Sequence, residues 1–182
     1  MADFKKYFPQ ILDFEGRVYE NVPGDAGGPT KYGIILSEWE TKGYDKNGDG
    51  KIDVEDLKLI TEDDAYKIYK ADYWDTIKGD QINNQTIASY ICDFGINCGI
   101  SLAIKKTQTI LGLLADGQFG PKSLQAVNSA NQKDLFNKLV ETRAAYYNAI
   151  VENHPAQNKF LKGWLRRTNS FNFVDDSSNN IA

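Results

Sequence analysis

Residues 87–97 limit the fold of this chain more than any other feature, because they form its most apolar helical stretch. Ile91 and Phe94 within this stretch suit a buried core. Thr61, followed three residues later by Asp64, predicts a capped helix start. Apolar residues at helical spacing also occur in the segments 3–15, 61–75, 100–111, 135–151 and 160–167. We therefore predict a mainly α-helical protein with residues 87–97 at its buried centre.

The first predicted helix ends in a carboxylate. Phe8, Ile11, Leu12 and Glu15 share one helical face, so Glu15 occupies a position that faces the core. Gly16 supplies a helix stop, which places Glu15 at the negative end of the helix dipole. Apolar neighbours and the dipole both disfavour the ionised form. Such a carboxyl group can hold its proton near neutral pH and donate it as a general acid.

A second carboxylate follows in a glycine- and proline-rich segment. Asp25 lies within residues 23–29, whose composition predicts an exposed turn, and we expect it to stay ionised. Residues 17–22 and 30–36 alternate in polarity and predict a hairpin in which Thr30 starts the returning strand. An acid paired with an ionised carboxylate is the arrangement that glycoside hydrolysis uses. The alternative is a capped helix followed by a surface turn, with Glu15 merely exposed.

Residues 45–56 follow the twelve-position pattern of calcium-binding loops, with glycine at position six and isoleucine at position eight. Position twelve carries aspartate in place of the usual glutamate, which resembles dockerin-type loops. We expect a structural Ca²⁺ that orders the loop, and no cofactor in catalysis. The alternative is a solvated acidic loop. The predicted ligands, of which the fourth uses its backbone carbonyl, are Asp45, Asn47, Asp49, Lys51, Asp53 and Asp56.

The motifs resemble those of a known enzyme family. Glu15, Asp25 and Thr30 are similar to the Glu/Asp/Thr catalytic set of phage-type lysozymes, with one extra residue between the first two. The wider pattern resembles glycoside hydrolase family 108, the N-acetylmuramidases, in its Glu-Gly-Gly, Asp-Pro-Gly-Gly, Thr and Tyr-Gly-Ile motifs. Arg17 and Ala26 depart from that pattern at positions without a chemical role.

The C-terminal part carries a second resemblance. Residues 113–124 resemble the Asp-Gly-x-x-Gly signature of peptidoglycan-binding helical domains, the usual companion of the catalytic half in this family. Without the resemblance, Asp116-Gly117 is an ordinary tight turn between helices. We expect a lysozyme-like catalytic region over residues 1–105, packed as one unit with a helical region over residues 106–168. The polar residues 169–182 are expected to form a flexible tail.

The resemblance implies a lysozyme-like helical fold with a small β-hairpin next to the active-site cleft. The implied reaction is hydrolysis of the β-1,4 bond between N-acetylmuramic acid and N-acetylglucosamine in peptidoglycan. Glu15 would protonate the leaving oxygen. Asp25 would activate water or shield the oxocarbenium charge, and Thr30 would help to hold that water, which favours inversion. The residues that we expect to contact the glycan are Gly28, Tyr32 and Trp74.

Two alternatives stay open. A lytic transglycosylase needs only the single acid and would release an anhydro-sugar, so it would tolerate the replacement of Asp25. A non-catalytic, calcium-stabilised module that binds peptidoglycan would need neither carboxylate.

The composition and net charge restrict the ligands and the catalytic systems that we expect for this chain. A net charge of −4 and a pI near 5.1 disfavour nucleic acid as a ligand. We expect glycan strands as the partner and a monomeric chain. Cys92 and Cys98 are expected to be reduced and structural, and a single histidine, His154, excludes a Ser-His or Cys-His nucleophilic system.

The sequence contains neither an N-terminal apolar segment of signal-peptide type nor an apolar stretch long enough for membrane insertion. We therefore expect synthesis in the cytoplasm. The protein would then reach the cell wall through a holin or a secretion system.

Overall fold

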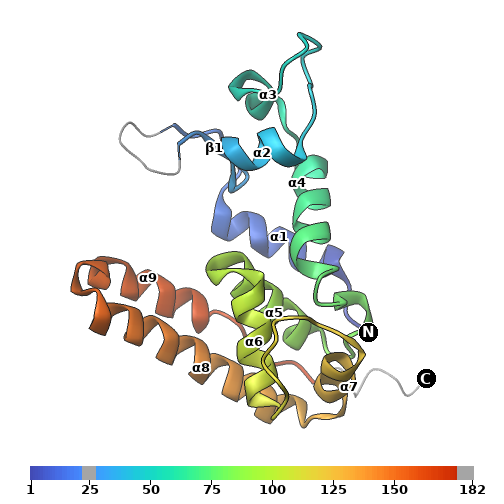
Figure 1. Ribbon diagram of the computed structural model, residues 1–182, viewed down its shortest axis with the longest axis vertical. Coiled ribbons are helices and arrows are strands. Elements are labelled where there is room, and N and C mark those ends of the chain that lie inside the picture. The colour runs from blue at the N-terminus through green and yellow to red at the C-terminus, as the bar shows by residue number, and fades with distance from the viewer. Residues whose placement is uncertain (22–27, 176–182) are drawn as a thin grey trace. The chain divides into compact units, whose positions relative to one another are not determined.

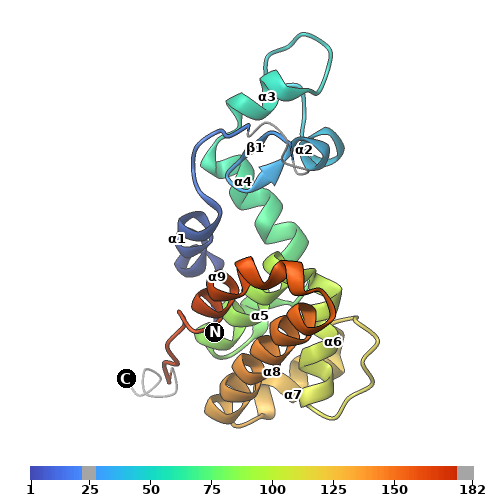
Figure 2. The same ribbon diagram turned by 90° about the vertical axis from the view of Figure 1, so that its left-hand side faces the viewer.

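The computed structural model describes residues 1–21 and 28–175, and it divides into two compact units (Figures 1 and 2). The N-terminal unit is Lys5–Asp72. The C-terminal unit combines Met1–Phe4 with the chain from Tyr73 onward. This division differs from the predicted boundary at residue 105. It does so because the central helix packs against the helices that follow it in the sequence.

The N-terminal unit is made of short helices joined by long connections (Figure 2). Buried aromatic and aliphatic side chains from these helices fill its interior, and Phe8 meets Tyr66 edge to face at 5.1 Å between ring centroids. The predicted capping box is confirmed, since Thr61 and Asp64 exchange hydrogen bonds at the start of the fourth helix. The helices are α1 (Phe4–Glu15), α2 (Leu36–Lys42), α3 (Val54–Leu59) and α4 (Glu62–Tyr69), and α4 continues as a π-helical turn over Lys70–Trp74.

A two-stranded antiparallel sheet lies in the N-terminal unit, formed by β1 (Thr30–Lys31) and β2 (Ile34–Ile35). Tyr32 and Gly33 connect the strands with φ angles of 53° and 76°, as a type I′ turn requires. The sequence predicted a different hairpin, between residues 17–22 and 30–36. Among the described residues that pairing consists of the bridge between Glu20 and Thr30, because the tight turn pairs the second segment with itself.

The C-terminal unit surrounds one buried helix, α5 (Gln85–Cys98) (Figure 1). Residues 86–95 of this helix are all buried, so the prediction of a central apolar helix is confirmed. Gly95 permits the close approach of the next helix, since a Cβ atom there would lie 2.6 Å from Ile100 Cδ1. The other helices are α6 (Ile100–Ile110), α7 (Pro121–Ser129), α8 (Gln132–Asn153) and α9 (Asn158–Thr168), with 3₁₀ turns at Gly79–Gln81 and Pro155–Gln157.

A buried ion cluster joins α5 to α8 and α9, which run side by side in both views. Asp93 and Arg143 are both fully buried, and Arg143 Nη1 donates to Asp93 Oδ2 at 2.7 Å. Arg167 Nη2 donates to the other oxygen at 2.8 Å. Burial opposes the charge of Arg143, but Asp93 beside it raises the pKa of the guanidinium overall. The carboxylate therefore holds three helices together.

The predicted flexible tail is wrong for its first seven residues, 169–175, while residues 176–182 lie outside the described residues. Phe171 is buried and meets the Tyr90 ring edge to face at 5.1 Å. The backbone of Val174 then bonds to side chains at the start of α5, because Asn84 Nδ2 donates to its carbonyl at 2.8 Å and its N–H donates to Thr86 Oγ1 at 3.2 Å. Phe173 likewise lies 5.8 Å from the Phe136 ring, so the polar segment contains two aromatic residues that pack on the folded C-terminal unit. Over the described ranges, no helix is long and apolar enough to cross a membrane.

Candidate active site

Glu15 is the last residue of α1, as the sequence predicts. Gly16 ends the helix with a φ of +84°, and its N–H still donates to the carbonyl of Leu12 at 3.0 Å. Ile11 and Leu12 are buried, and Glu15, on the same face, is half-buried. The helix therefore carries its terminal carboxylate at the edge of an apolar surface rather than fully in solvent.

The turn between β1 and β2 lies directly against Glu15. A Cβ atom at Gly33 would lie 2.7 Å from Glu15 Cβ and 2.5 Å from Tyr69 Oη, so no larger residue fits without displacement. Tyr69, which is buried in α4, donates its hydroxyl hydrogen to the carbonyl of Tyr32 at 2.9 Å. The turn, held by Tyr69 of α4, thus packs closely against the base of the Glu15 side chain.

Thr30 is the centre of the small sheet. Its N–H and carbonyl both bond to Glu20, at 2.9 Å each, and β1 pairs it with Ile35 on the other side. Thr30 does begin a strand, but this strand is the first of the β1–β2 hairpin and meets the preceding segment through its bridge to Glu20. Gly28 and Tyr32, two of the predicted glycan contacts, are half-buried and adopt positive φ angles of 67° and 53°. Asp25, the predicted second carboxylate, lies outside the described residues.

The burial of Trp74 disagrees with the prediction from the sequence that this residue contacts the glycan. Its side chain is fully buried in the C-terminal unit, 5.3 Å from the Phe4 ring. Its indole N–H donates to Asp80 at 2.7 Å, and Gly79 packs on the ring so closely that a Cβ atom would lie 2.3 Å away. A ring enclosed in this way cannot stack on a sugar, so Trp74 is a core residue.

Tyr69 is the residue of this region that sequence reasoning missed. The helical spacing assigned it to a buried face, which is correct but gives no partner. Its hydrogen bond crosses 37 positions of sequence to the turn beside Glu15. The one available signal is the tyrosine hydroxyl itself, because a buried phenol usually finds a hydrogen-bond partner.

The loop 45–56 folds around its own carboxylates. Asp45 accepts from the N–H groups of Gly48 and Gly50, at 2.6 and 2.8 Å. Asp53 caps α3. Asp56 is fully buried and accepts from the N–H groups of residues 46, 47 and 53 at 2.7 to 3.1 Å. These bonds, above all the one from the Asp53 N–H, lower the pKa of Asp56 although its burial opposes this.

This arrangement bears on the predicted calcium site. Within the described part of the chain, no three acidic, histidine or cysteine side chains gather closely enough to hold a metal ion. The predicted ligands point at backbone N–H groups of the loop rather than at a common centre. In this arrangement the loop carboxylates accept from backbone N–H groups, and calcium binding stays a prediction from the sequence.

Comparisons with known proteins relate both parts of the chain to described families. Residues 8–99 match the family model described as Glycosyl hydrolase 108, and residues 102–169 match the model described as Predicted Peptidoglycan domain. The structure is similar to that of SagA from Brucella abortus, with 30% sequence identity and a TM-score of 0.72. That match covers 91% of this chain and 88% of the other. None of the curated proteins matches the sequence.

Proposed function

The chain belongs to glycosyl hydrolase family 108, and from this premise we propose that it cleaves the β-1,4 bond between N-acetylmuramic acid and N-acetylglucosamine, with Glu15 as proton donor. Family membership and the second matched region make the protein a glycoside hydrolase that acts on peptidoglycan. The finer statement concerns the bond and the residues. It is supported by the packing of Gly33 in the type I′ turn against the Glu15 side chain, and by the hydrogen bond with which Tyr69 fixes that turn.

The support for Glu15 is positional. A general acid must be held within hydrogen-bond reach of the leaving oxygen, and small displacements reduce catalysis strongly. Glu15 is held from two sides, because its helix ends at Gly16 and Gly33 packs on its Cβ atom. The remaining roles follow from spacing in the sequence. Asp25 activates the attacking water, and Thr30, fixed between two backbone partners, orients it.

A lytic transglycosylase remains the alternative, since it needs an acid but no base for water. In that case replacement of Asp25 by asparagine would leave most activity intact. Under the hydrolytic proposal the same replacement lowers activity by orders of magnitude, because water is no longer activated.

The decisive experiment is digestion of purified peptidoglycan with the wild type, Glu15→Gln and Asp25→Asn, followed by mass spectrometry of the released fragments. We expect reducing N-acetylmuramic acid ends from the wild type. For Glu15→Gln we expect a loss of about 10² to 10⁴ in rate with an unchanged melting temperature. Glu20→Gln is the matched control, because Glu20 is exposed and bonds to Thr30 through its backbone. Anhydro-sugar ends, reducing ends on glucosamine, or full activity of Glu15→Gln would refute the proposal.

A further inference from the structure

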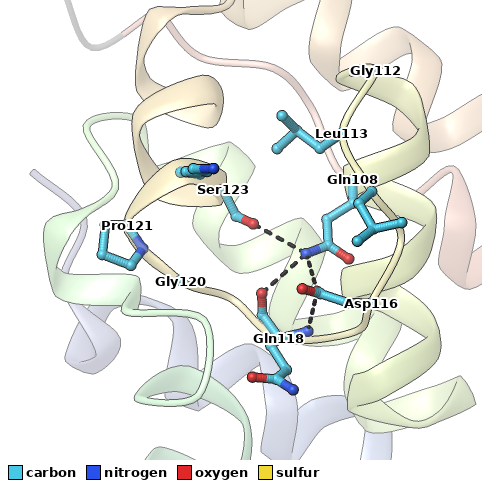
Figure 3. A pocket seen from close by; sticks show the side chains of 10 residues that line it. Gln108, Gly112, Leu113, Asp116, Gln118, Gly120, Pro121 and Ser123 are labelled. Carbon is cyan, nitrogen blue, oxygen red and sulfur yellow. Dashed lines mark hydrogen bonds between the residues drawn. The ribbon is translucent and has the colours of Figure 1, made fainter.

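The C-terminal unit contains a pocket of about 630 Å³ between the end of α6, the loop after it and the start of α7 (Figure 3). It lies within the region matched by the peptidoglycan domain, and no residue of the proposed catalytic set lines it. Leu113, Leu114 and Pro121 give it apolar walls. Leu114 is 83% exposed, so the fold holds a large apolar side chain in water at the edge of this pocket.

Gln108 makes the pocket a fixed structure. This α6 side chain is almost fully buried, and its amide nitrogen donates to Asp116 Oδ1, the Gln118 carbonyl and Ser123 Oγ at 2.8 to 3.1 Å (Figure 3). Its amide oxygen accepts from the N–H of Gly117 at 3.0 Å. One side chain therefore joins α6 to residues 116–118 in the second half of the loop and to α7, which fixes this wall of the pocket.

The pocket carries two charges of opposite sign. Lys122 makes no salt bridge with any residue that the structure describes, and its side chain lines the pocket. Asp116 is exposed on another side, and hydrogen bonds from the Gln118 N–H and from Gln108 lower the pKa of its carboxyl group. A ligand that satisfies both groups must bring a carboxylate and a cation, with small apolar groups between them.

This chemistry favours a peptide over a sugar. Sugar platforms are aromatic, and none of the residues lining the pocket has an aromatic side chain. The stem peptide of peptidoglycan carries alanine methyl groups, free carboxylates and, in uncrosslinked form, the ammonium group of a diamino acid. Each of these has a counterpart among the apolar walls, Lys122 and Asp116.

We propose that this pocket binds the stem peptide of peptidoglycan, with Lys122 pairing a peptide carboxylate, Asp116 pairing the diamino-acid ammonium group, and Leu114 covering alanine methyl groups. The proposal rests on the proposed function in one respect, namely that peptidoglycan is the polymer on which the enzyme acts. It adds a binding site in a different unit from Glu15. The C-terminal unit would bind the stem peptide, and the unit that contains Glu15 would hydrolyse the glycan.

The test is calorimetric titration of the full chain with a synthetic stem pentapeptide that has no sugar, and in parallel with a peptide-free N-acetylglucosamine tetramer. We expect saturable binding of the peptide that Lys122→Gln weakens about tenfold, as the loss of one charge-assisted hydrogen bond predicts. Leu114→Asn should weaken it by a similar factor. The controls are Lys138→Gln, at an exposed lysine of α8, and Leu59→Asn, at a leucine that is 49% exposed on α3. Both should bind like the wild type.

The two proposals fail separately. Peptide binding by a chain that releases no sugar ends would leave the pocket assignment intact and refute the proposed reaction. Hydrolysis without peptide binding, or equal affinity of Lys122→Gln and wild type at equal melting temperature, would refute the pocket assignment alone. If the assignment holds, Lys122→Gln raises the KM for intact peptidoglycan, whereas Lys138→Gln does not.

Discussion

Two kinds of carboxylate environment can be compared, and a clear example of each lies in a different unit. In the N-terminal unit, Asp45, Asp56 and Asp64 each accept from nearby backbone N–H groups and so close a loop or a helix start. In the C-terminal unit, Asp93 is buried between two guanidinium groups from distant helices. Local carboxylates are removable at modest cost, whereas a buried one that balances two charges is not.

Glu15 lies in a third kind of position, at the C-terminal end of α1. It is half-buried at a helix end, and its surroundings are fixed by a glycine and by a tyrosine that bonds to a neighbouring carbonyl. A carboxylate on an apolar helical face can belong to a structural ion cluster or can have a chemical role. Asp93, in the most apolar helix of the chain, is of the first kind.

The largest effect on stability should separate these two carboxylates. Asp93→Asn leaves the buried Arg143 without its counter-charge, so we expect the free energy of unfolding to fall by about 3 to 5 kcal/mol. Denaturant unfolding followed by circular dichroism measures this. Arg167→Gln should show a smaller loss, because Arg167 is only partly buried. If Glu15→Gln proves as destabilising as Asp93→Asn, the distinction between the two carboxylates is wrong.

Gly33→Ala tests whether the surroundings of Glu15 are fixed by close packing. The new methyl group would meet Tyr69 and Glu15 at a residue with a φ of +76°, so we expect a loss of about 1 to 3 kcal/mol in stability. We also expect hydrolysis to slow by about 10²-fold, because the carboxyl is displaced. Gly48→Ala is the control, since Gly48 has a φ of +80° and open space around it. Equal activity of the two variants would show that the contact has no role.

Measuring stability as a function of pH tests the role of Asp64, a carboxylate held by nearby hydrogen-bond donors. Burial alone would raise the pKa of Asp64, but hydrogen bonds from Lys46 and Thr61 outweigh it and lower the value from 3.8 to about 2. Because the folded pKa is the lower one, its stabilisation is complete well above pH 3.8 and is lost as the pH falls toward 2. Asp64→Asn should therefore lower stability by about 1 to 2 kcal/mol at pH 6, a difference that shrinks on acidification.

The control for this titration is Asp63→Asn, which removes only an exposed pair with Lys67. We expect it to change stability by less than about 0.5 kcal/mol at any pH. A difference between Asp64→Asn and wild type that stays constant from pH 6 to pH 2 would contradict the assignment of Asp64.

Calcium should have the smallest effect, because the loop 45–56 is already closed by its own hydrogen bonds. We expect millimolar calcium to raise the melting temperature of the stripped protein by about 2 to 4 °C, equivalent to about 1 kcal/mol. Differential scanning calorimetry with calcium and with chelator measures the shift. The double variant Asp45→Asn, Asp49→Asn should lose it. Equal melting temperatures of the wild type with calcium and with chelator would refute the prediction that this loop binds calcium.

Local patterns in the sequence determined much of this protein. The helix through residues 87–97, the stop at Gly16 and the cap at Thr61 each depend on neighbours within a few positions, and all three are present in the structure. The family motifs likewise lie in one short stretch, and the matched family model confirms what they indicate. These features can be predicted from the sequence because the residues that interact are close together in the chain.

Only the tertiary structure decided the contacts that join distant residues. Gly33 against Glu15, Tyr69 on the turn, Asp93 between two arginines and Phe171 on Tyr90 are separated by 18 to 81 positions, and no periodicity announces them. Trp74 was assigned to the glycan for the same reason, since a sequence shows that a ring is large and apolar but not which side chains enclose it. The sequence pattern does not show which distant side chains contact one another. Close packing in the folded protein determines these contacts, and with them the neighbours of each carboxylate.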